Sequence, residues 1–343
     1  MELHFTKTNG PVDEAIDRLF DLAGDVHHPA IVRDIILAAL KAGQENSGRM
    51  DLKIMNTTLK EMRFTAKVFN PYRGVRKVAT FGSARTGPDE PIYHMARDLG
   101  RGLAGAGYMV ITGGGPGIMQ AVNEGAGTDS SFGVNIRLPF EQIQNPIVRG
   151  NPKSITYKYF FNRKIAFLKE SDAVILFPGG FGTLDEAMES LTLVQTGKRA
   201  PLPLVLVDTP GGTYWRHWVN FVKKGLMDHG FITPDDMALF DMVDSADEAV
   251  ERVKHFYRNY QSLRYVGEKL VLRLNRKIAQ EEAEALRARF KDILIPGGDI
   301  RPSGPLEQEA DEPGISHLPR VVVDFNRRDF GGLRKLIDAI NEL

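Results

Sequence analysis

The sequence predicts an α/β fold, in which a doubly wound parallel sheet with helices on both faces is flanked by two smaller parts. Between residues 71 and 262, short apolar runs alternate with longer helix-like segments, as in parallel strands joined by helical crossovers. Two of these runs lead directly into glycine-rich turns. The alternation is missing on either side, so we expect a helical accessory region over 1–70, the α/β domain over 71–262 and a C-terminal α+β extension over 263–343.

The first 70 residues are predicted to be helical. Apolar residues recur there at three- and four-residue spacing, which gives a helix one apolar face. The pattern ends at Asn70-Pro71-Tyr72-Arg73-Gly74, where proline and glycine disfavour a continuing helix. The predicted helices cover 13–22, 29–42 and 52–69.

In the α/β domain, each apolar run is predicted to be a strand and each interval a helix. The strands are expected near 77–82, 108–112, 132–138, 173–177, 203–208 and 239–243. The helices are expected near 90–106, 116–127, 154–170, 183–196, 213–228 and 246–261. A ligand of such a sheet binds at the carboxyl ends of the strands, where the strand order reverses.

The C-terminal extension is predicted to mix strands and helices. Strands are expected over 270–274 and 320–325, and helices over 279–290 and 333–343, with a Pro-, Gly- and acid-rich loop or linker over 295–319 between them. The extension shows no metal-ligand spacing and no nucleophile–base signature. A packing or dimer surface is therefore favoured over a regulatory ligand site.

Composition excludes several classes of protein. Lys plus Arg and Asp plus Glu both number 44 in the 343 residues, which argues against broad binding to nucleic acid or anionic membranes. The chain has no cysteine, so disulfides and thiolate metal sites are excluded. It also has no apolar signal region and no run of membrane-spanning length. We expect a cytoplasmic protein without a metal or cofactor, and we interpret the adjacent His27 and His28 as surface or capping residues.

The most informative segment follows the strand expected at 173–177. It reads Pro178-Gly179-Gly180-Phe181-Gly182-Thr183-Leu184-Asp185-Glu186. Glycines let backbone amides approach an anion closely, and a helix that begins here presents free N–H groups and the positive end of its dipole. Thr183 adds a hydroxyl donor, while Glu186 lies about one turn into the helix. The segment therefore predicts a phosphate site with an acid beside it.

Two further turns support a phosphate site. Gly113-Gly114-Gly115-Pro116-Gly117 follows the strand at 108–112, and Gly82-Ser83-Ala84-Arg85 follows the strand at 77–82. One such turn is as consistent with a plain tight connection as with anion binding, but several in one sheet favour one nucleotide. The G-x-G-x-x-G register and the triphosphate P-loop are both absent. The predicted ligand is a nucleoside monophosphate.

These turns, with Asn162-Arg163-Lys164 between them, resemble the LOG family of Rossmann-like nucleoside 5′-monophosphate phosphoribohydrolases over roughly residues 75–260. The resemblance rests on two sequences, GGGPGIMQAVNEGA and PGGFGTLDE. The second of them matches the family signature PGGxGTxxE. The resemblance implies that Glu186 and Arg163 are the catalytic pair and that the protein is a homodimer or higher homo-oligomer. Plant-type members carry Met-His-Glu-Arg-Lys where this chain has Phe160-Phe161-Asn162-Arg163-Lys164, so a prenylated adenine substrate is not implied.

The residue types suit N-glycosidic hydrolysis, which passes through a cationic ribose. Glu186 can stabilise that cation and position or deprotonate water, whereas Arg163 can hold phosphate or ribose hydroxyls and Lys164 adds a point charge. The alternative for Arg163 and Lys164 is a solvated helix face or an ion pair with Glu170 or Asp172. For Phe160 and Phe161, the sequence favours equally a packing role and a role as walls of the base pocket.

Two functions are therefore predicted in order of preference. The first is hydrolysis of a purine-type nucleoside monophosphate, such as AMP, to free base and ribose 5-phosphate. The second is a non-catalytic nucleotide-binding or sensing protein, or a carrier of a phosphorylated pterin such as the molybdenum cofactor. A lysine decarboxylase is disfavoured, because no His is directly followed by a Lys and the usual His-Lys signature of a pyridoxal phosphate site is therefore missing.

Overall fold

The computed structural model describes residues 8–45, 48–139 and 143–343. The chain forms two compact units, Met1–Arg63 and Phe64–Leu343. The first unit contains α1 (Pro11–Ala23), α2 (Pro29–Glu45) and most of α3 (Arg49–Phe69), so the three helices predicted from apolar spacing are confirmed. An ion pair of 2.6 Å between Asp13 of α1 and Arg33 of α2 joins two of them.

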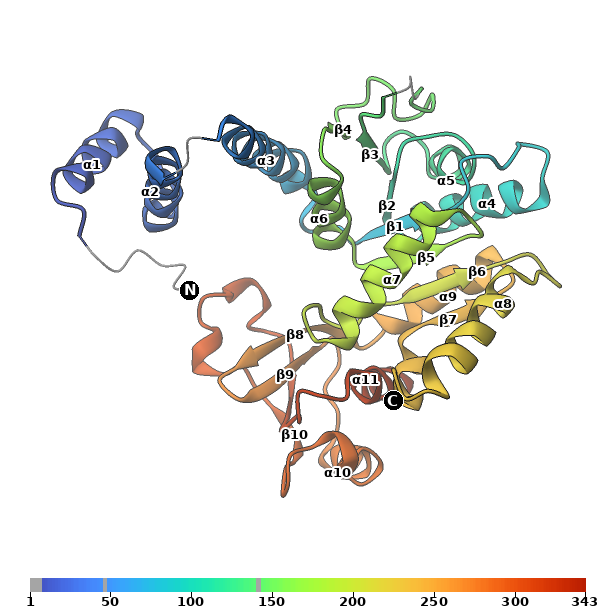
Figure 1. Ribbon diagram of the computed structural model, residues 1–343. Helices are drawn as coiled ribbons and strands as arrows, with labels where there is room; N and C mark the ends of the chain where they lie inside the picture. The colour runs from blue at the N-terminus through green and yellow to red at the C-terminus, as the bar shows by residue number, and fades with distance from the viewer. Residues whose placement is uncertain (1–7, 46–47, 140–142) are drawn as a thin grey trace. The chain divides into compact units, whose positions relative to one another are not determined.

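The second unit is built on a seven-stranded parallel sheet with the order β4-β3-β2-β1-β5-β6-β7 (Figure 1). The strand order reverses at β1, which pairs with β2 on one side and β5 on the other, so the predicted doubly wound fold is confirmed. The strands are β1 (Lys77–Phe81), β2 (Met109–Thr112), β3 (Ser131–Ile136), β4 (Ser154–Tyr157), β5 (Ala173–Leu176), β6 (Leu204–Val207) and β7 (Asp241–Val243).

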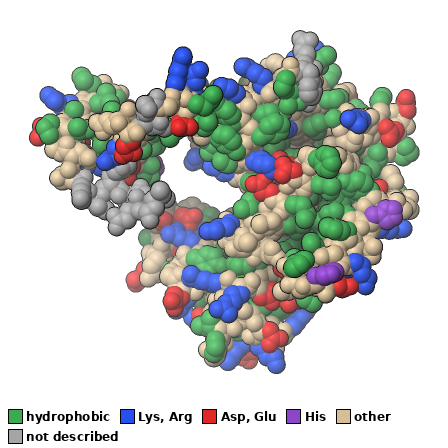
Figure 2. All heavy atoms as spheres, in the orientation of Figure 1, with side chains coloured by type: hydrophobic (Ala, Val, Ile, Leu, Met, Phe, Trp, Pro, Cys, Tyr) green, Lys and Arg blue, Asp and Glu red, His purple; other side chains and the backbone are tan. Residues whose placement is uncertain are grey.

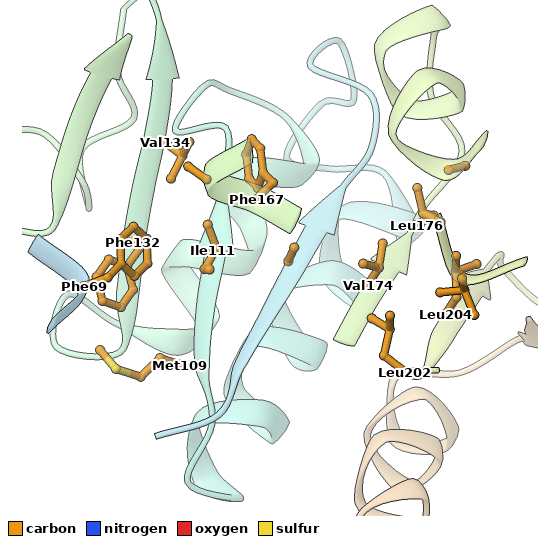
Figure 3. Packing of buried hydrophobic residues seen from close by; sticks show 14 of the residues in the cluster. Phe69, Met109, Ile111, Phe132, Val134, Phe167, Val174, Leu176, Leu202 and Leu204 are labelled. Atoms are coloured by element: carbon orange, nitrogen blue, oxygen red, sulfur yellow. The ribbon is translucent and has the colours of Figure 1, made fainter. Parts of the chain in front are cut away.

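Helices cover both faces of this sheet because its strands are apolar on both sides. One face packs against α4 (Pro91–Gly105), α5 (Ile118–Ala126) and α9 (Ala246–Phe256). The other face packs against the end of α3, α6 (Phe160–Glu170), α7 (Phe181–Gln195) and α8 (Tyr214–Phe221). Figure 3 shows this second core, where Phe69 stacks on Phe132 at 4.3 Å between ring centroids. Trp215 of α8 is fully buried there, and its ring packs edge-on against that of Trp218.

Several predicted boundaries are wrong. Residues 154–157 were expected to begin a helix but form the edge strand β4, because Ile155 and Tyr157 turn inward with period two and pair with β3. The strand expected from residue 239 begins at Asp241, since a 3₁₀ helix capped by Thr233 occupies Pro234–Leu239. The helix expected over 213–228 changes to a π-helical turn at Val222–Met227.

The C-terminal part forms a four-stranded antiparallel sheet with the order β10-β11-β9-β8. Its elements are β8 (Tyr260–Val266), β9 (Lys269–Leu274), α10 (Gln280–Arg289), β10 (Ile300–Ser303), β11 (Arg320–Val323) and α11 (Phe330–Glu342). The helix predicted to reach residue 261 ends at Phe256, and the predicted loop over 295–319 contains β10. The first difference arises because residues 260–266 form a hairpin with β9, and the second because residues 300–303 pair with β11, about 20 residues later.

This antiparallel sheet has its own apolar core, but it lies in the same compact unit as the parallel sheet. Glu309 is buried between Arg273 and Arg320, at 2.8 and 3.1 Å. The predicted domain boundaries at residues 70 and 262 stay predictions. Across the described residues, no helix combines the length and apolarity needed to span a membrane.

Candidate active site

The three predicted glycine-rich turns meet at the carboxyl ends of β1, β2 and β5. The backbone N–H of Ser83 donates to the carbonyl of Pro178 at 3.0 Å, and the N–H of Ile118 donates to the carbonyl of Ser83 at 3.0 Å. The turn after β1 therefore joins the other two. The N-termini of α5 and α7 lie at this edge of the sheet, as two parallel strand–turn–helix units require.

Two glycines are needed for this close approach. Gly117 has a φ of +69°, and a Cβ there would lie 2.3 Å from the carbonyl oxygen of Ser83. A Cβ on Gly179 would lie 2.2 Å from the Oγ1 atom of Thr183. In contrast, a Cβ on Gly180 or Gly182 would meet nothing within 4 Å. These last two glycines thus border open space at the first turn of α7.

The turn after β2 is held by polar side chains that sequence reasoning missed. The N–H of Gly114 donates to Thr112 Oγ1 at 3.0 Å, so it is already used within the protein. Asn145 Nδ2 donates to the carbonyl of Gly115 at 3.1 Å and to Asn123 Oδ1 at 3.0 Å. Asn123, Asn135 and Asn145 are all buried, and a buried amide must find hydrogen-bond partners, but burial is not visible in the local sequence of Asn145.

Arg163 lies in the second turn of α6 and reaches the turn after β2. Its Nε donates to the carbonyl of Val134 at 2.8 Å, and its guanidinium carbon lies 5.3 Å from the centre of the Phe167 ring. A Cβ on Gly113 would lie 2.4 Å from its Nη2 atom, so the glycine leaves the space that the guanidinium fills. Burial lowers the pKa of Arg163, while the nearby charge of Glu186 raises it. No ion pair to Glu170 or Asp172 is seen among the described residues.

Glu186 is a buried carboxylate on α7, with 8% of the residue exposed. Its Oε1 atom lies 3.7 Å from Lys164 Nζ, and its Oε2 atom has no hydrogen-bond partner within the part of the chain that the structure describes. Burial raises the pKa of Glu186 to about 7, and the charges of Lys164 and Arg163 oppose this rise only in part. A carboxyl group that titrates near neutral pH and keeps an oxygen available is suited to accept a proton or to stabilise a cation.

Lys164 is engaged with the acidic side of α7. Its Nζ lies 2.8 Å from Asp185 and also bonds Glu189, which places α6 beside α7 in Figure 1. Burial lowers the pKa of Lys164, but the bonds to Asp185 and Glu189 outweigh this and raise it overall. Among the described residues, the ion pairs of Lys164 are therefore with α7, and not with Glu170 or Asp172.

The raised pKa of Glu186 predicts a pH-dependent cost to stability. Because the folded pKa lies above the unfolded one, the stability that the group contributes is present below about pH 4.5 and is lost as pH rises through about 7. Glu186→Gln removes this loss, so its stability relative to wild type should increase between pH 5 and pH 8, by up to about 3 kcal/mol.

Thermal or urea unfolding at both pH values measures this difference. Asp185→Asn is the matched control, because that carboxylate is on the same helix, also bonds Lys164 and is 58% exposed. A Glu186→Gln variant whose relative stability is the same at both pH values would contradict the assignment.

Known proteins are similar in sequence to this part of the chain. Residues 118–253 match the family model described as possible lysine decarboxylase. The cytokinin riboside 5′-monophosphate phosphoribohydrolase of Mycobacterium tuberculosis is 30% identical over 163 residues, which cover 46% of this chain and 83% of that protein. One such enzyme of Arabidopsis thaliana is 27% identical over 186 residues, covering 53% and 83%. Among solved structures, the molybdenum cofactor carrier protein of Chlamydomonas reinhardtii aligns with 52% of this chain and 96% of its own, at 21% identity and a TM-score of 0.38.

Proposed function

The chain belongs to the LOG family of phosphoribohydrolases, and on this premise we propose that it hydrolyses the N-glycosidic bond of a purine-type nucleoside 5′-monophosphate, such as AMP. The products are the free base and ribose 5-phosphate. One observation carries the proposal: a buried carboxylate with an available oxygen, Glu186, follows a phosphate-type turn and lies near Arg163. A site that only held a phosphate would gain nothing from a carboxylate there, because the two negative charges repel.

In this proposal, the 5′-phosphate binds at the first turn of α7. Gly180 and Gly182 border open space there, and the first N–H groups of the helix have no intrahelical acceptor. Thr183, Gly82 and Ser83 complete the cradle with Pro178 and Gly179. The turn at Gly113, Gly114, Gly115 and Gly117 shapes the cradle and brings the N-terminus of α5 to it. The Gly114 N–H does not bind the phosphate itself, because it already donates to Thr112 Oγ1.

Glu186 acts on the ribose. As the bond from C1′ to the base nitrogen breaks, its electron pair goes to the base and positive charge develops on C1′ and the ring oxygen. The Glu186 carboxylate stabilises this charge and accepts a proton from the water whose oxygen bonds to C1′. A proton is then taken up by the leaving base, so water is consumed and no other reactant is needed.

Arg163 orients this machinery from α6. Its Nε is fixed on the Val134 carbonyl, which leaves the terminal nitrogens of the guanidinium to face phosphate or ribose oxygens. Lys164 binds the acids of α7 and lies 3.7 Å from Glu186, so it favours the ionised form of that carboxylate. We therefore propose that the positive charge of Lys164 contributes to substrate binding as well as to the ionisation of Glu186.

The ligand form tests the proposed site. Nucleoside 5′-monophosphates should bind at least about tenfold more tightly than the same nucleosides, because the phosphate carries the charge that two helix N-termini and Arg163 attract. Calorimetry with AMP and adenosine measures the difference, and an assay of released base over a panel of monophosphates identifies the substrate. Equal affinity for AMP and adenosine would contradict the phosphate cradle. Tight binding of every monophosphate without base release would favour a binding or carrier protein.

We also propose that the protein is at least a homodimer, formed through the outer faces of α6 and α7. These helices carry five large apolar side chains that are exposed by 39 to 93%, and Figure 2 shows hydrophobic side chains beside charges of both signs on this face. The side chains are Phe160, Phe161, Ile165, Phe181 and Met188. Light scattering at low micromolar concentration should give at least twice the chain mass, and Phe161→Asp should reduce it. A wild-type monomer that hydrolyses nucleotide would contradict this assembly.

A further inference from the structure

A hollow separate from the candidate active site lies at the opposite edge of the parallel sheet, where β1, β5 and β6 begin. Its volume is about 570 Å³, which is within the range of pockets that hold small organic molecules. Arg73 and Arg76 precede β1, Asp172 precedes β5, Arg199 follows α7, and Tyr257 follows α9. We call this hollow the arginine pocket. It contains none of the glycine-rich turns and neither Glu186 nor Arg163.

The charges of the arginine pocket do not balance. Three arginines line it with one acidic residue, Asp172, so the side chains that line it carry a net charge of about +2. Asp172 is itself partly engaged, because its Oδ2 atom accepts the backbone N–H of Lys77 at 2.8 Å and its Oδ1 atom lies 3.6 Å from Arg76. The guanidinium of Arg73 makes no hydrogen bond or ion pair with the described residues. The pocket therefore attracts a ligand with about two negative charges.

Two of the arginines are held in place before any ligand binds. Arg76 lies over the Tyr257 ring, 3.6 Å from its centre, and its Nη2 donates to the carbonyl of Gln261 at 3.0 Å. Arg199 Nη2 donates to the carbonyl and to the hydroxyl of Ser171, while Arg199 Nη1 has no hydrogen-bond acceptor among the residues described. Guanidinium groups fixed in this way lose little side-chain entropy when they bind an oxyanion.

We propose that the arginine pocket binds the phosphate monoester of a small organic molecule, at a site separate from the candidate active site. A phosphate monoester carries about 1.5 to 2 negative charges at pH 7, which matches the uncompensated charge, and its oxygens match the arginine fork. The hollow is larger than a phosphate group, and Leu202 and Leu263 line it together with Tyr257. The remaining space suits the organic part of the ligand.

The position of the pocket connects it to the helix that carries Glu186. α7 begins at the phosphate-type turn and ends at Gln195, and the chain then reaches Arg199, whose N–H donates to the carbonyl of Leu193 in the last turn. From Glu186 to Gln195 the helix extends about 14 Å, so one bound monophosphate does not fill both sites. The ligand of the arginine pocket is therefore a second molecule.

Calorimetric titration with ribose 5-phosphate tests this site. Arg73→Gln and Arg199→Gln should each weaken one binding event at least about tenfold, or remove it, relative to wild type. Arg73→Gln is the decisive variant, because its exposed side chain has no partner whose loss would unfold the protein. Lys198→Gln is the matched control, since it removes a neighbouring exposed charge that does not line the pocket. Neither Arg73→Gln nor Lys198→Gln should change the rate of nucleotide hydrolysis.

Three results would overturn the proposal. One is a wild-type titration that Arg73→Gln and Arg199→Gln leave unchanged. Another is an equal loss in Lys198→Gln, which would show attraction to general positive charge and no defined pocket. The third is binding of succinate, a dianion without phosphate, that is as tight as that of ribose 5-phosphate and is weakened to the same extent by Arg73→Gln. Because the test compares variants of this pocket, its result does not depend on whether the candidate active site also binds the probe.

Discussion

Glu186→Gln is expected to reduce hydrolysis at least about 100-fold while leaving nucleotide affinity within a few-fold of wild type. The substitution keeps the shape of the side chain but removes the negative charge that a cationic ribose requires and the oxygen that accepts a proton from water. A 100-fold loss corresponds to about 2.7 kcal/mol of transition-state stabilisation, which is typical for one preorganised electrostatic contact in a buried site. Released base, followed under saturating AMP, measures the loss, and calorimetry measures the affinity.

Asp185→Asn separates this effect from a general loss of charge on α7. Asp185 precedes Glu186 and bonds Lys164 at 2.8 Å, but its side chain is largely exposed. We expect at most a several-fold change in rate for this variant, because its carboxylate does not face the proposed ribose position. Wild-type turnover in Glu186→Gln, or an equal loss in both variants, would remove Glu186 from the catalytic role.

The pKa of Glu186 also sets the pH dependence of the reaction. The ionised carboxylate is the active form in the proposed mechanism, and burial raises its pKa to about 7. The ratio kcat/KM should therefore rise as pH increases through about 7 and then level off. Over the same pH range, ionisation of Glu186 raises the rate but lowers the folding stability. The ionised form of the site is therefore both the catalytic form and the less stable form.

Sequence predicted the parts of this site that depend on local chemistry. A strand followed by a glycine-rich turn and a helix fixes where Gly179, Gly180 and Gly182 lie, and helix geometry then places Glu186 near the first turn of α7. The same reasoning gave the parallel sheet and the edge at which its turns meet. The structure confirms this arrangement, while the roles of these residues stay proposals.

Contacts between distant segments could not be predicted in the same way. The sequence of β4 predicts the start of a helix, because its pairing with β3 is set by residues about 20 positions away and not by its own short pattern. The acidic partners of Lys164 lie on α7, more than 20 residues later, so only the packing of α6 against α7 identifies them. The arginine pocket joins segments from residue 73 to residue 263, and no local pattern shows that these meet.

The contact between Arg163 and the Val134 carbonyl also joins distant segments of the chain. It determines how a substitution of Arg163 should affect the rate. Arg163→Lys keeps the positive charge but loses both the Nε–H that donates to the Val134 carbonyl at 2.8 Å and the planar fork. We expect it to lower kcat/KM by at least about 100-fold, nearly as much as Arg163→Met, because position and not only charge is required. Activity assays on both variants, with circular dichroism to confirm folding, measure this.

Gly113→Ala tests the same point without changing Arg163 itself. The added Cβ would lie 2.4 Å from Arg163 Nη2 and 2.7 Å from Met119 Sδ, so both the guanidinium and the end of the Met119 side chain must move. We expect Gly113→Ala to lower kcat/KM at least about tenfold through the displaced guanidinium. It should have little further effect when combined with Arg163→Met, because the flexible Met119 side chain can shift and the guanidinium is then already absent. Losses that simply multiply in the double variant would mean that Gly113 acts through the turn itself. An Arg163→Lys enzyme with wild-type kcat/KM would show that a charge anywhere in this part of the site suffices, and that the fixed guanidinium has no special role in catalysis.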